Sequence, residues 1–460
     1  MEFVQILDAP IRPGGLVEWT PSTPGGFGDW HRDPRATSHN HEHHLRSAHE
    51  YRERTNQAGG REAWLGVSVE FDEPFSVPAV RAMLTAYINR HEVLRTHVAL
   101  SGSTTTRYTA DPGTVRVTMR RIGWYTETDL LTEQIAGSLD RATAPLLWPA
   151  YRFATVSRPG GFTLLFAADH SLVDGYSLAN APHEFRELYQ AARDRTAGRL
   201  PRTGSYIDFS GTERVAADEA GDDHPAVAVW RGFLDGDTAL PRFEALPERD
   251  RPETRIPQRS HNDLLLDADR TAAFERACAG HGGATVVGGL LAAAAIVYRA
   301  QTGADRFATL MPRHTRTSER FQTALGWFVG LAPVAVDVAD DPGFPVALDR
   351  AMDSLDSARA GASLPLLRLA EILGFDPAPR FVVSYMDLRR VPGNAASAAA
   401  GDLALRSHAY SDDEVYVWVN RTDVGLLLHT RFPADDADGA ALAAFLTDFA
   451  DLLASIAAGE

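Results

Sequence analysis

The sequence predicts a two-domain α/β protein, on two observations. Its 460 residues are too many for one ordinary hydrophobic core. Both halves of the chain also alternate strand-like apolar runs with helix-like stripes, which is typical of α/β folds. We expect a first domain in residues 1–195, a connecting region rich in Asp, Arg, Pro and Gly in residues 196–262, and a second domain in residues 263–460.

In the first half, the hydrophobic periodicity predicts four strands and three helices. Apolar residues alternate from Trp64 to Phe71, and an unbroken apolar run from Phe162 to Ala168 indicates a buried strand. Ser76 can cap a helix that runs to Arg90. The expected strands are 64–71, 115–122, 150–156 and 162–168, with the last two joined at Gly160-Gly161, and the further helices are 129–141 and about 179–192.

The second half also alternates predicted helices and strands. Asp269 is expected to cap a helix that ends near Ala279, and Thr285 to cap a mostly buried helix over 286–298. The expected strands are 306–311 and 381–386, with a hairpin of 415–419 and 426–430 and a closing helix over 439–457.

Composition excludes several classes of function. The 61 acidic residues outnumber the 45 basic ones, and this argues against nucleic acid or an anionic membrane as a main partner. Every basic residue is arginine, which excludes a Schiff-base lysine and a P-loop lysine. The single cysteine, Cys278, allows no intrachain disulfide and is expected in a helix core. With no signal-like start and no apolar run of ~20 residues, we expect a soluble cytoplasmic protein.

A histidine cluster near residue 40 raises the question of a metal site. His39 and His43 have the i, i+4 spacing of a helical ligand pair, but the His-Glu-x-x-His order is missing and no further ligand is indicated. We therefore expect no metal site here.

The strand 162–168 ends in a segment with the composition of a catalytic loop. His170 follows the strand almost at once, and Asp174 and Gly175 follow four and five residues later. A strand fixes the backbone, a loop exposes an imidazole, and a glycine allows a tight turn, which is what a positioned general base requires. The alternative interpretation is that His170 is a buried, hydrogen-bonded histidine of the core with no catalytic role.

This segment resembles the His-His-x-x-x-Asp-Gly motif of the condensation-domain superfamily. That superfamily includes non-ribosomal peptide condensation domains, polyketide-associated (Pap) acyltransferases and, more distantly, chloramphenicol acetyltransferase. The first motif histidine is Asp169 here. Two further segments resemble the family, 90–96 (Arg-His-Glu-Val-Leu-Arg-Thr) and 325–334, in which Gly330 stands where asparagine is usual. Segments 19–22 and 417–422 look most like the Pap group.

The resemblance implies two chloramphenicol-acetyltransferase-like subdomains that form a V, with the active-site channel between them. It assigns His170 as the catalytic base and implies that Asp174 turns away to pair with an arginine, for which Arg313 is expected. Backbone N–H groups around Gly175 are candidate oxyanion donors. His91 and Glu92, in the second matching segment, are expected to be structural.

Two positions beside the motif remain open. Asp169 is expected to be mainly structural; alternatively, its charge raises the pKa of His170 or contacts a cationic acceptor. Tyr176 is a candidate for substrate contact.

By this resemblance we expect a free-standing acyltransferase of secondary-metabolite or lipid biosynthesis. It would transfer an acyl group from a CoA or carrier-protein thioester to an alcohol. Expected partners are a small-molecule acceptor and a possible acyl or peptidyl carrier protein in trans, without a tightly bound cofactor. The alternatives are an amide-forming condensation enzyme that works with carrier proteins, and an inactive condensation-like recruitment module.

Overall fold

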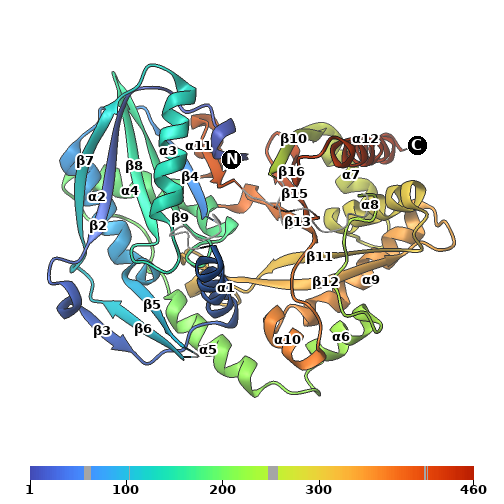
Figure 1. Ribbon diagram of the computed structural model, residues 1–460. Coiled ribbons are helices and arrows are strands. Elements are labelled where there is room, and N and C mark those ends of the chain that lie inside the picture. Colours follow the sequence, from blue (N-terminus) through green and yellow to red (C-terminus); the bar gives the residue numbers. More distant parts are fainter. Residues whose placement is uncertain (56–63, 103, 247–256, 409–410, 412, 460) are drawn as a thin grey trace. The chain divides into compact units, whose positions relative to one another are not determined.

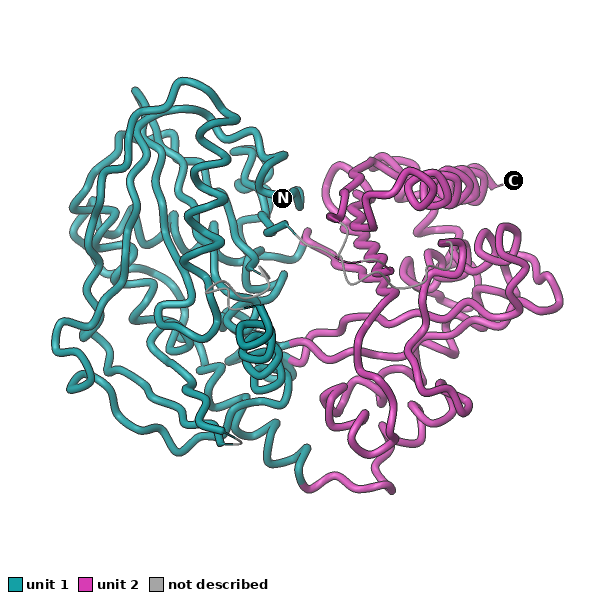
Figure 2. Tube along the Cα trace, in the orientation of Figure 1, with its two compact units in different colours: residues 1–218, 316–328, 390–409 teal, residues 219–315, 329–389, 410–460 magenta. Residues whose placement is uncertain are grey.

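The computed structural model describes residues 1–55, 64–102, 104–246, 257–408, 411 and 413–459, which divide into two compact units (Figures 1 and 2). Unit 1 comprises residues 1–218, 316–328 and 390–409, and unit 2 comprises residues 219–315, 329–389 and 410–460. The expected boundaries made each domain one continuous stretch. The structure instead includes two segments of the second half in unit 1. Segment 390–409 belongs there because its strand β14 (Leu403–Arg406) pairs with β1 and β4, and segment 316–328 because Arg316 and Phe328 hydrogen-bond to Asp174.

Unit 1 is built on a seven-stranded sheet in the order β1-β14-β4-β9-β8-β2-β7, in which only the β1–β14 pair is parallel. A second, antiparallel sheet has the order β3-β6-β5. The remaining strands are β1 (Glu2–Gln5), β2 (Gly15–Ser22), β3 (Trp30–Asp33), β4 (Trp64–Phe71), β5 (Thr96–Ser101), β6 (Thr104–Ala110), β7 (Arg116–Trp124), β8 (Tyr151–Arg158) and β9 (Gly161–Asp169).

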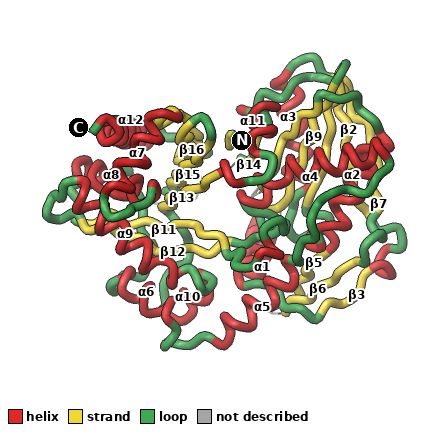
Figure 3. Tube along the Cα trace, turned by 180° about the vertical axis from the view of Figure 1, so that it is seen from behind, coloured by secondary structure: helices red, strands yellow, loops and turns green. Residues whose placement is uncertain are grey.

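Helices cover both faces of the large sheet. Figure 3 shows helices α2 and α4 beside the strands of this sheet. Aromatic side chains of these helices and the strands pack together on that face, among them Tyr87, Phe153, Phe166 and Phe185. On the other face, Leu131, Ile135 and Leu139 of α3 pack on apolar residues of β8 and β9. The helices are α1 (His39–Thr55), α2 (Val77–Arg90), α3 (Thr128–Ala142), α4 (Gly175–Asp194), α5 (Tyr206–Glu219) and α11 (Asn394–Ala400).

Unit 2 contains a six-stranded mixed sheet in the order β10-β16-β15-β13-β11-β12. Its strands are β10 (Gln258–Asp267), β11 (Arg306–His314), β12 (Val329–Asp337), β13 (Phe381–Asp387), β15 (Val415–Thr422) and β16 (Gly425–Pro433). Its helices are α6 (Pro225–Leu234), α7 (Ala268–Gly280), α8 (Val286–Thr302), α9 (Phe344–Gly361), α10 (Leu366–Leu373) and α12 (Asp436–Ala458). Thr285 caps α8 as predicted, but Asp267, not Asp269, caps α7.

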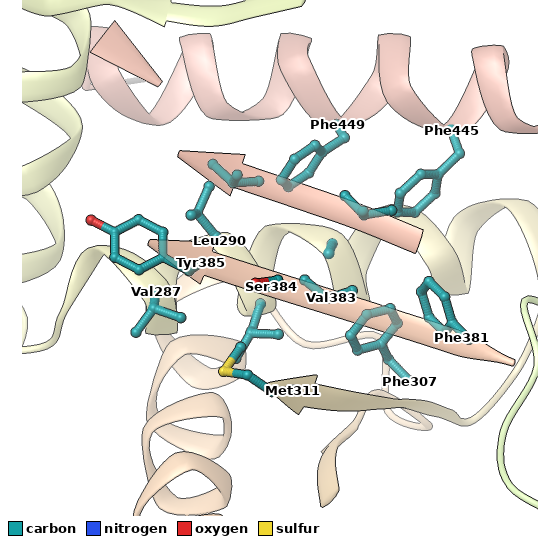
Figure 4. Close-up of a pocket in the computed structure, with 14 residues that line it drawn as sticks. Val287, Leu290, Phe307, Met311, Phe381, Val383, Ser384, Tyr385, Phe445 and Phe449 are labelled. Atoms are coloured by element: carbon teal, nitrogen blue, oxygen red, sulfur yellow. The ribbon is translucent and has the colours of Figure 1, made fainter. Parts of the chain in front are cut away.

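Unit 2 contains a pocket whose lining is almost entirely apolar. This narrow pocket lies among side chains of α8, β11, β13, β15 and α12, and Phe445 and Phe449 of α12 point toward the sheet there (Figure 4). Tyr385 supplies the only ionisable group among its lining residues, and burial raises the pKa of that phenol to about 12. None of the residues that line this pocket can therefore act as a general acid or base near neutral pH.

Helix α12 meets the length and mean hydropathy of a membrane span, although its sequence contains no uninterrupted apolar run of ~20 residues. Charged residues such as Asp448 and Asp451 interrupt its apolar sequence. Its apolar side chains are buried in the core of unit 2, including Leu442, Phe445, Leu446, Phe449 and Leu453. We interpret α12 as a core helix.

Candidate active site

The predicted catalytic segment lies at the end of a fully buried central strand. All nine residues of β9 are buried, between β4 on one side and β8 on the other. The hairpin that joins β8 to β9 turns at Gly160, whose φ of +83° suits glycine. The backbone that leads to His170 is therefore fixed by two neighbouring strands.

Asp174 is the most heavily hydrogen-bonded group of the segment. Its carboxylate accepts two bonds from the Arg316 guanidinium, at 2.8 and 2.9 Å. It also accepts the backbone N–H of Ser177 at 2.7 Å, as the N-cap of α4, and that of Phe328 at 2.9 Å. Burial opposes the charged carboxylate, but Arg316 and these bonds outweigh burial and lower the pKa of Asp174.

The arginine predicted to hold Asp174 was the wrong one. Arg316, whose side chain is 1% exposed, makes the ion pair, whereas Arg313 lies within β11 of unit 2, opposite Gly330 on β12. The strand was expected to end at Met311 but continues to His314, so the loop begins later than expected. Arg316 belongs to the segment 316–328, which packs with unit 1.

Helix α4 begins at Gly175, about four residues before the expected start. Gly175 is therefore the first residue of a helix and not the centre of a tight turn, although its N–H lies in the first turn, where helices favour negative charge. Tyr176 is half-buried, and the Arg316 guanidinium lies 5.0 Å from the centre of its ring. Contact of Tyr176 with substrate stays a prediction.

Asp169, which replaces the first motif histidine, is buried and partnered. It is 1% exposed, and one carboxylate oxygen lies 3.0 Å from Nε2 of His44 on α1. The other oxygen accepts the backbone N–H of Ser171 at 3.0 Å and the Ser171 hydroxyl. Contact with a cationic acceptor does not fit a carboxylate this buried, whereas the charge of Asp169 does act to raise the pKa of His170, against the larger effect of burial. A mainly structural role for Asp169 stays a prediction.

His170 is half-buried, and its imidazole packs on Trp327, with ring centres 4.8 Å apart. Burial lowers the pKa of His170 below its usual value of about 6.5; its own backbone carbonyl opposes this, and the nearby His44 adds to it. The imidazole is therefore neutral near pH 7 and able to accept a proton. Its Nδ1 atom is buried.

The histidine cluster of α1 is divided among different partners. His39 contacts Asp218, His43 lies on the surface near Ser47, and His44 contacts Asp169. Burial lowers the pKa of His41 to about 3, so this ring is neutral. No group of three or more metal-ligating side chains occurs in the described parts of the chain.

His91 and Glu92, which were expected to be structural, both make internal contacts. Nε2 of His91 lies 2.6 Å from the buried Glu184 carboxylate on α4. Glu92 accepts hydrogen bonds from the Arg35 guanidinium and the Ser205 hydroxyl.

Sequence reasoning missed three residues of the site: His44, Arg316 and Trp327. Trp327 lay within the third segment that resembles the family, but nothing in the sequence indicated that its ring contacts His170. His44 had a detectable signal, because an aspartate at a buried motif position requires a nearby cation or donor.

Comparison with known proteins points to one family. A family model described as a condensation domain matches residues 57–396. The acyltransferase PapA3 of Mycobacterium tuberculosis (strain ATCC 25618 / H37Rv) is 26% identical over 97% of this chain and 97% of its own length. The 2'-acyl-2-O-sulfo-trehalose (hydroxy)phthioceranyltransferase PapA1 of Mycobacterium tuberculosis (strain CDC 1551 / Oshkosh) is 28% identical, over 90% of this chain and 80% of that protein.

A solved structure of a PapA2 acyl transferase has the same fold. It superposes with a TM-score of 0.88 at 21% identity, and covers 99% of this chain and 100% of that one. At this level of identity the likeness is one of architecture, from the first strands to the last helix.

Proposed function

This chain belongs to the condensation-domain family and is an acyltransferase, and we propose that it esterifies an alcohol with an acyl thioester, using His170 as the general base. The predicted α/β class and the resemblance to this family are thereby confirmed. The observation that carries the proposal is His170 itself. Its imidazole is neutral near pH 7, half-buried, and follows directly a strand that is fixed on both sides.

The reaction needs one proton transfer in each direction. As the acceptor oxygen attacks the thioester carbonyl, the Nε2 atom of His170 takes the hydroxyl proton, because Nδ1 is buried. The tetrahedral intermediate then expels sulfur, the C–S bond breaks, and the imidazolium returns the proton to the thiolate. The products are an ester and a free thiol. His170 ends in its original state.

The oxyanion of the intermediate requires donors. The N–H of Gly175 in the first turn of α4 is our candidate, because the N-terminus of a helix stabilises negative charge. The ion pair of Asp174 with Arg316 fixes this turn from behind. In this proposal Asp174 positions the loop and takes no proton from the substrate.

The acceptor we propose is an alcohol, and the donor is acyl-CoA or an acyl group on a carrier protein supplied in trans. The name of PapA1 describes acyl transfer to a sulfated trehalose, whose acceptor groups are hydroxyls. A hydroxyl also needs a base more than a neutral amine does, since it is protonated at neutral pH. A cytoplasmic location and a role in lipid or secondary-metabolite synthesis stay predictions.

The test offers the enzyme two acceptors with the same skeleton, one a hydroxyl and one an amine, with acyl-CoA and carrier-bound donors. Thiol release is followed and the product is identified by mass and alkaline lability. We expect an alkali-labile ester. We also expect at least a ~10²-fold loss of turnover in His170→Ala, with no loss in His43→Ala, a surface histidine of α1.

Two results would change the assignment. A strong amine preference with a base-stable product would make this an amide-forming condensation enzyme. Unchanged turnover in His170→Ala would remove His170 as the base.

A further inference from the structure

A buried ion pair lies immediately beside the proposed base, and the reaction above does not use it. Asp169 directly precedes His170, and its carboxylate is 3.0 Å from Nε2 of His44. The Asp169 side chain is 1% exposed and that of His44 is 18% exposed. A carboxylate buried this deeply is costly without a partner, so His44 is a requirement of the fold at this point.

The carboxylate of Asp169 also shapes the backbone on both sides of His170. It accepts the N–H and the hydroxyl of Ser171, and the carbonyl of Asp169 accepts the N–H of Leu172 at 2.9 Å. A side chain that binds the N–H two residues ahead fixes the residue between them, which here is His170. The direction of the imidazole therefore depends on Asp169 staying in place.

His44 reaches His170 by a second route, through Trp327. The His44 ring meets the indole edge-on with centres 6.0 Å apart, and the His170 ring lies against the same indole at 4.8 Å. His44 therefore contacts both the Asp169 carboxylate and the Trp327 indole, and each of these lies next to His170.

The charges around His170 are balanced in two pairs. Asp169 faces His44 of α1, and Asp174 faces Arg316. Two further histidines of α1 lie near His44. His41 is buried, and burial lowers its pKa to about 3, whereas the exposed His43 has its pKa lowered by partial burial of its ring and by the charge of His44, so neither adds a charge at neutral pH. Burial opposes a charged His44, but Asp169 outweighs this and raises the pKa of His44.

We infer that His44 and Asp169 are a positioning pair for His170, in which α1 supplies the partner that a buried aspartate at the first motif position requires. The inference rests on the proposed role of His170 as base. Neither member of the pair touches substrate in this assignment. Each acts through His170, by fixing its backbone and by keeping the local charge balanced.

The test combines turnover with a measurement that needs no substrate. NMR with imidazole-labelled histidine gives the pKa of His170 in wild type, His44→Gln, Asp169→Asn, the double variant and a charge-swapped His44→Asp/Asp169→His protein. The matched control is His43→Gln, one position away on α1 with its side chain at the surface.

We expect His44→Gln to raise the pKa of His170, because an anion is left beside it without its cation. The double neutral variant should bring that pKa back toward wild type. Turnover should fall in both single variants by up to about 10²-fold, the cost of a misplaced catalytic group. The charge-swapped protein should recover part of this loss, and the control should show none.

Two results would overturn the inference: a His170 pKa and turnover that do not respond to His44→Gln, or a charge swap no better than the single variants. If the pair only packs against its surroundings, His44→Gln would lower turnover while the pKa of His170 stays at its wild-type value in the single and the double variants. If the pKa responds as expected while His170→Ala remains active, the pair is real and the proposed function is wrong.

Discussion

Two buried carboxylates stand at opposite ends of the same short loop, and they are held by different kinds of cation. Asp174, at the start of α4, pairs with Arg316, whereas Asp169, at the end of β9, pairs with His44. Both carboxylates are 1% exposed. Burial opposes their ionisation, and their partners overcome it and lower the pKa of each.

The difference lies in what the partner can do when the carboxylate is lost. An arginine keeps its charge at any accessible pH, so a vacated Arg316 would be a stranded buried cation. A histidine can release its proton and become neutral. Two equally buried carboxylates can therefore differ in how much stability is lost when each is removed. We expect the larger loss of unfolding free energy at Asp174.

The largest effect is expected at Asp174. Asp174→Ala should lower the free energy of unfolding by about 3–5 kcal/mol, because it strands Arg316, and it also removes the N-cap of α4. Urea unfolding measures this, with His170→Ala as a reference that should lose less. An Asp174→Ala protein as stable as wild type but inactive would mean that the aspartate acts on the substrate.

Asp169→Ala should cost less, about 1.5–3 kcal/mol, the range for a lost hydrogen bond to a charged group. His44 can lose its proton once its partner is gone, so no charge is stranded. The same urea titration measures it. A loss equal to that of Asp174→Ala would show that the type of cation does not matter here.

The sequence predicted the strands of the site better than its contacts. β4 was predicted at its observed bounds, and β9 within one residue of each end, because unbroken or alternating apolar residues define them locally. The role of Asp174 as a carboxylate paired to arginine also matches the structure. These features depend on local pattern or on a motif whose spacing is short.

The missed features depend on distant parts of the chain. Arg313 was the expected partner of Asp174, and periodicity does not show that β11 continues past this residue to His314. His44 lies 125 residues before Asp169, and the two strands that pair with β14 lie more than 300 residues before it. Pairings of this kind are decided by packing, which one sequence does not display.

The two ends of the loop should also differ in their response to pH. A folded-state pKa that is raised, as for His44, gives stability that is fully present below the unfolded value of about 6.5 and is lost as pH rises through the folded value. A lowered pKa, as for Asp174, gives stability that is present above about 3.9 and is lost only as pH falls through the folded value.

The stability difference between wild type and His44→Gln should therefore shrink as the pH rises above about 6.5, the unfolded value for histidine. The corresponding difference for Asp174→Ala should stay constant over that range. Both are measured as unfolding free energies, with His43→Gln to correct for the other histidines. A difference for His44→Gln that is flat in pH would show that His44 is not charged in the folded protein.

The smallest effect is expected at Arg313, the residue that was first assigned to Asp174. Among the described residues no carboxylate pairs with its guanidinium, and burial and the charge of Arg359 lower the pKa of Arg313. Relief from that like charge offsets the packing lost on truncation, so Arg313→Ala should change the unfolding free energy by no more than about 0.5 kcal/mol. Arg316→Ala, three residues away, should cost about 3–5 kcal/mol because it leaves the Asp174 carboxylate buried and unpaired. Parallel unfolding of the two variants decides which arginine holds the loop. A larger loss of unfolding free energy in Arg313→Ala than in Arg316→Ala would show that Arg313, in β11, holds it.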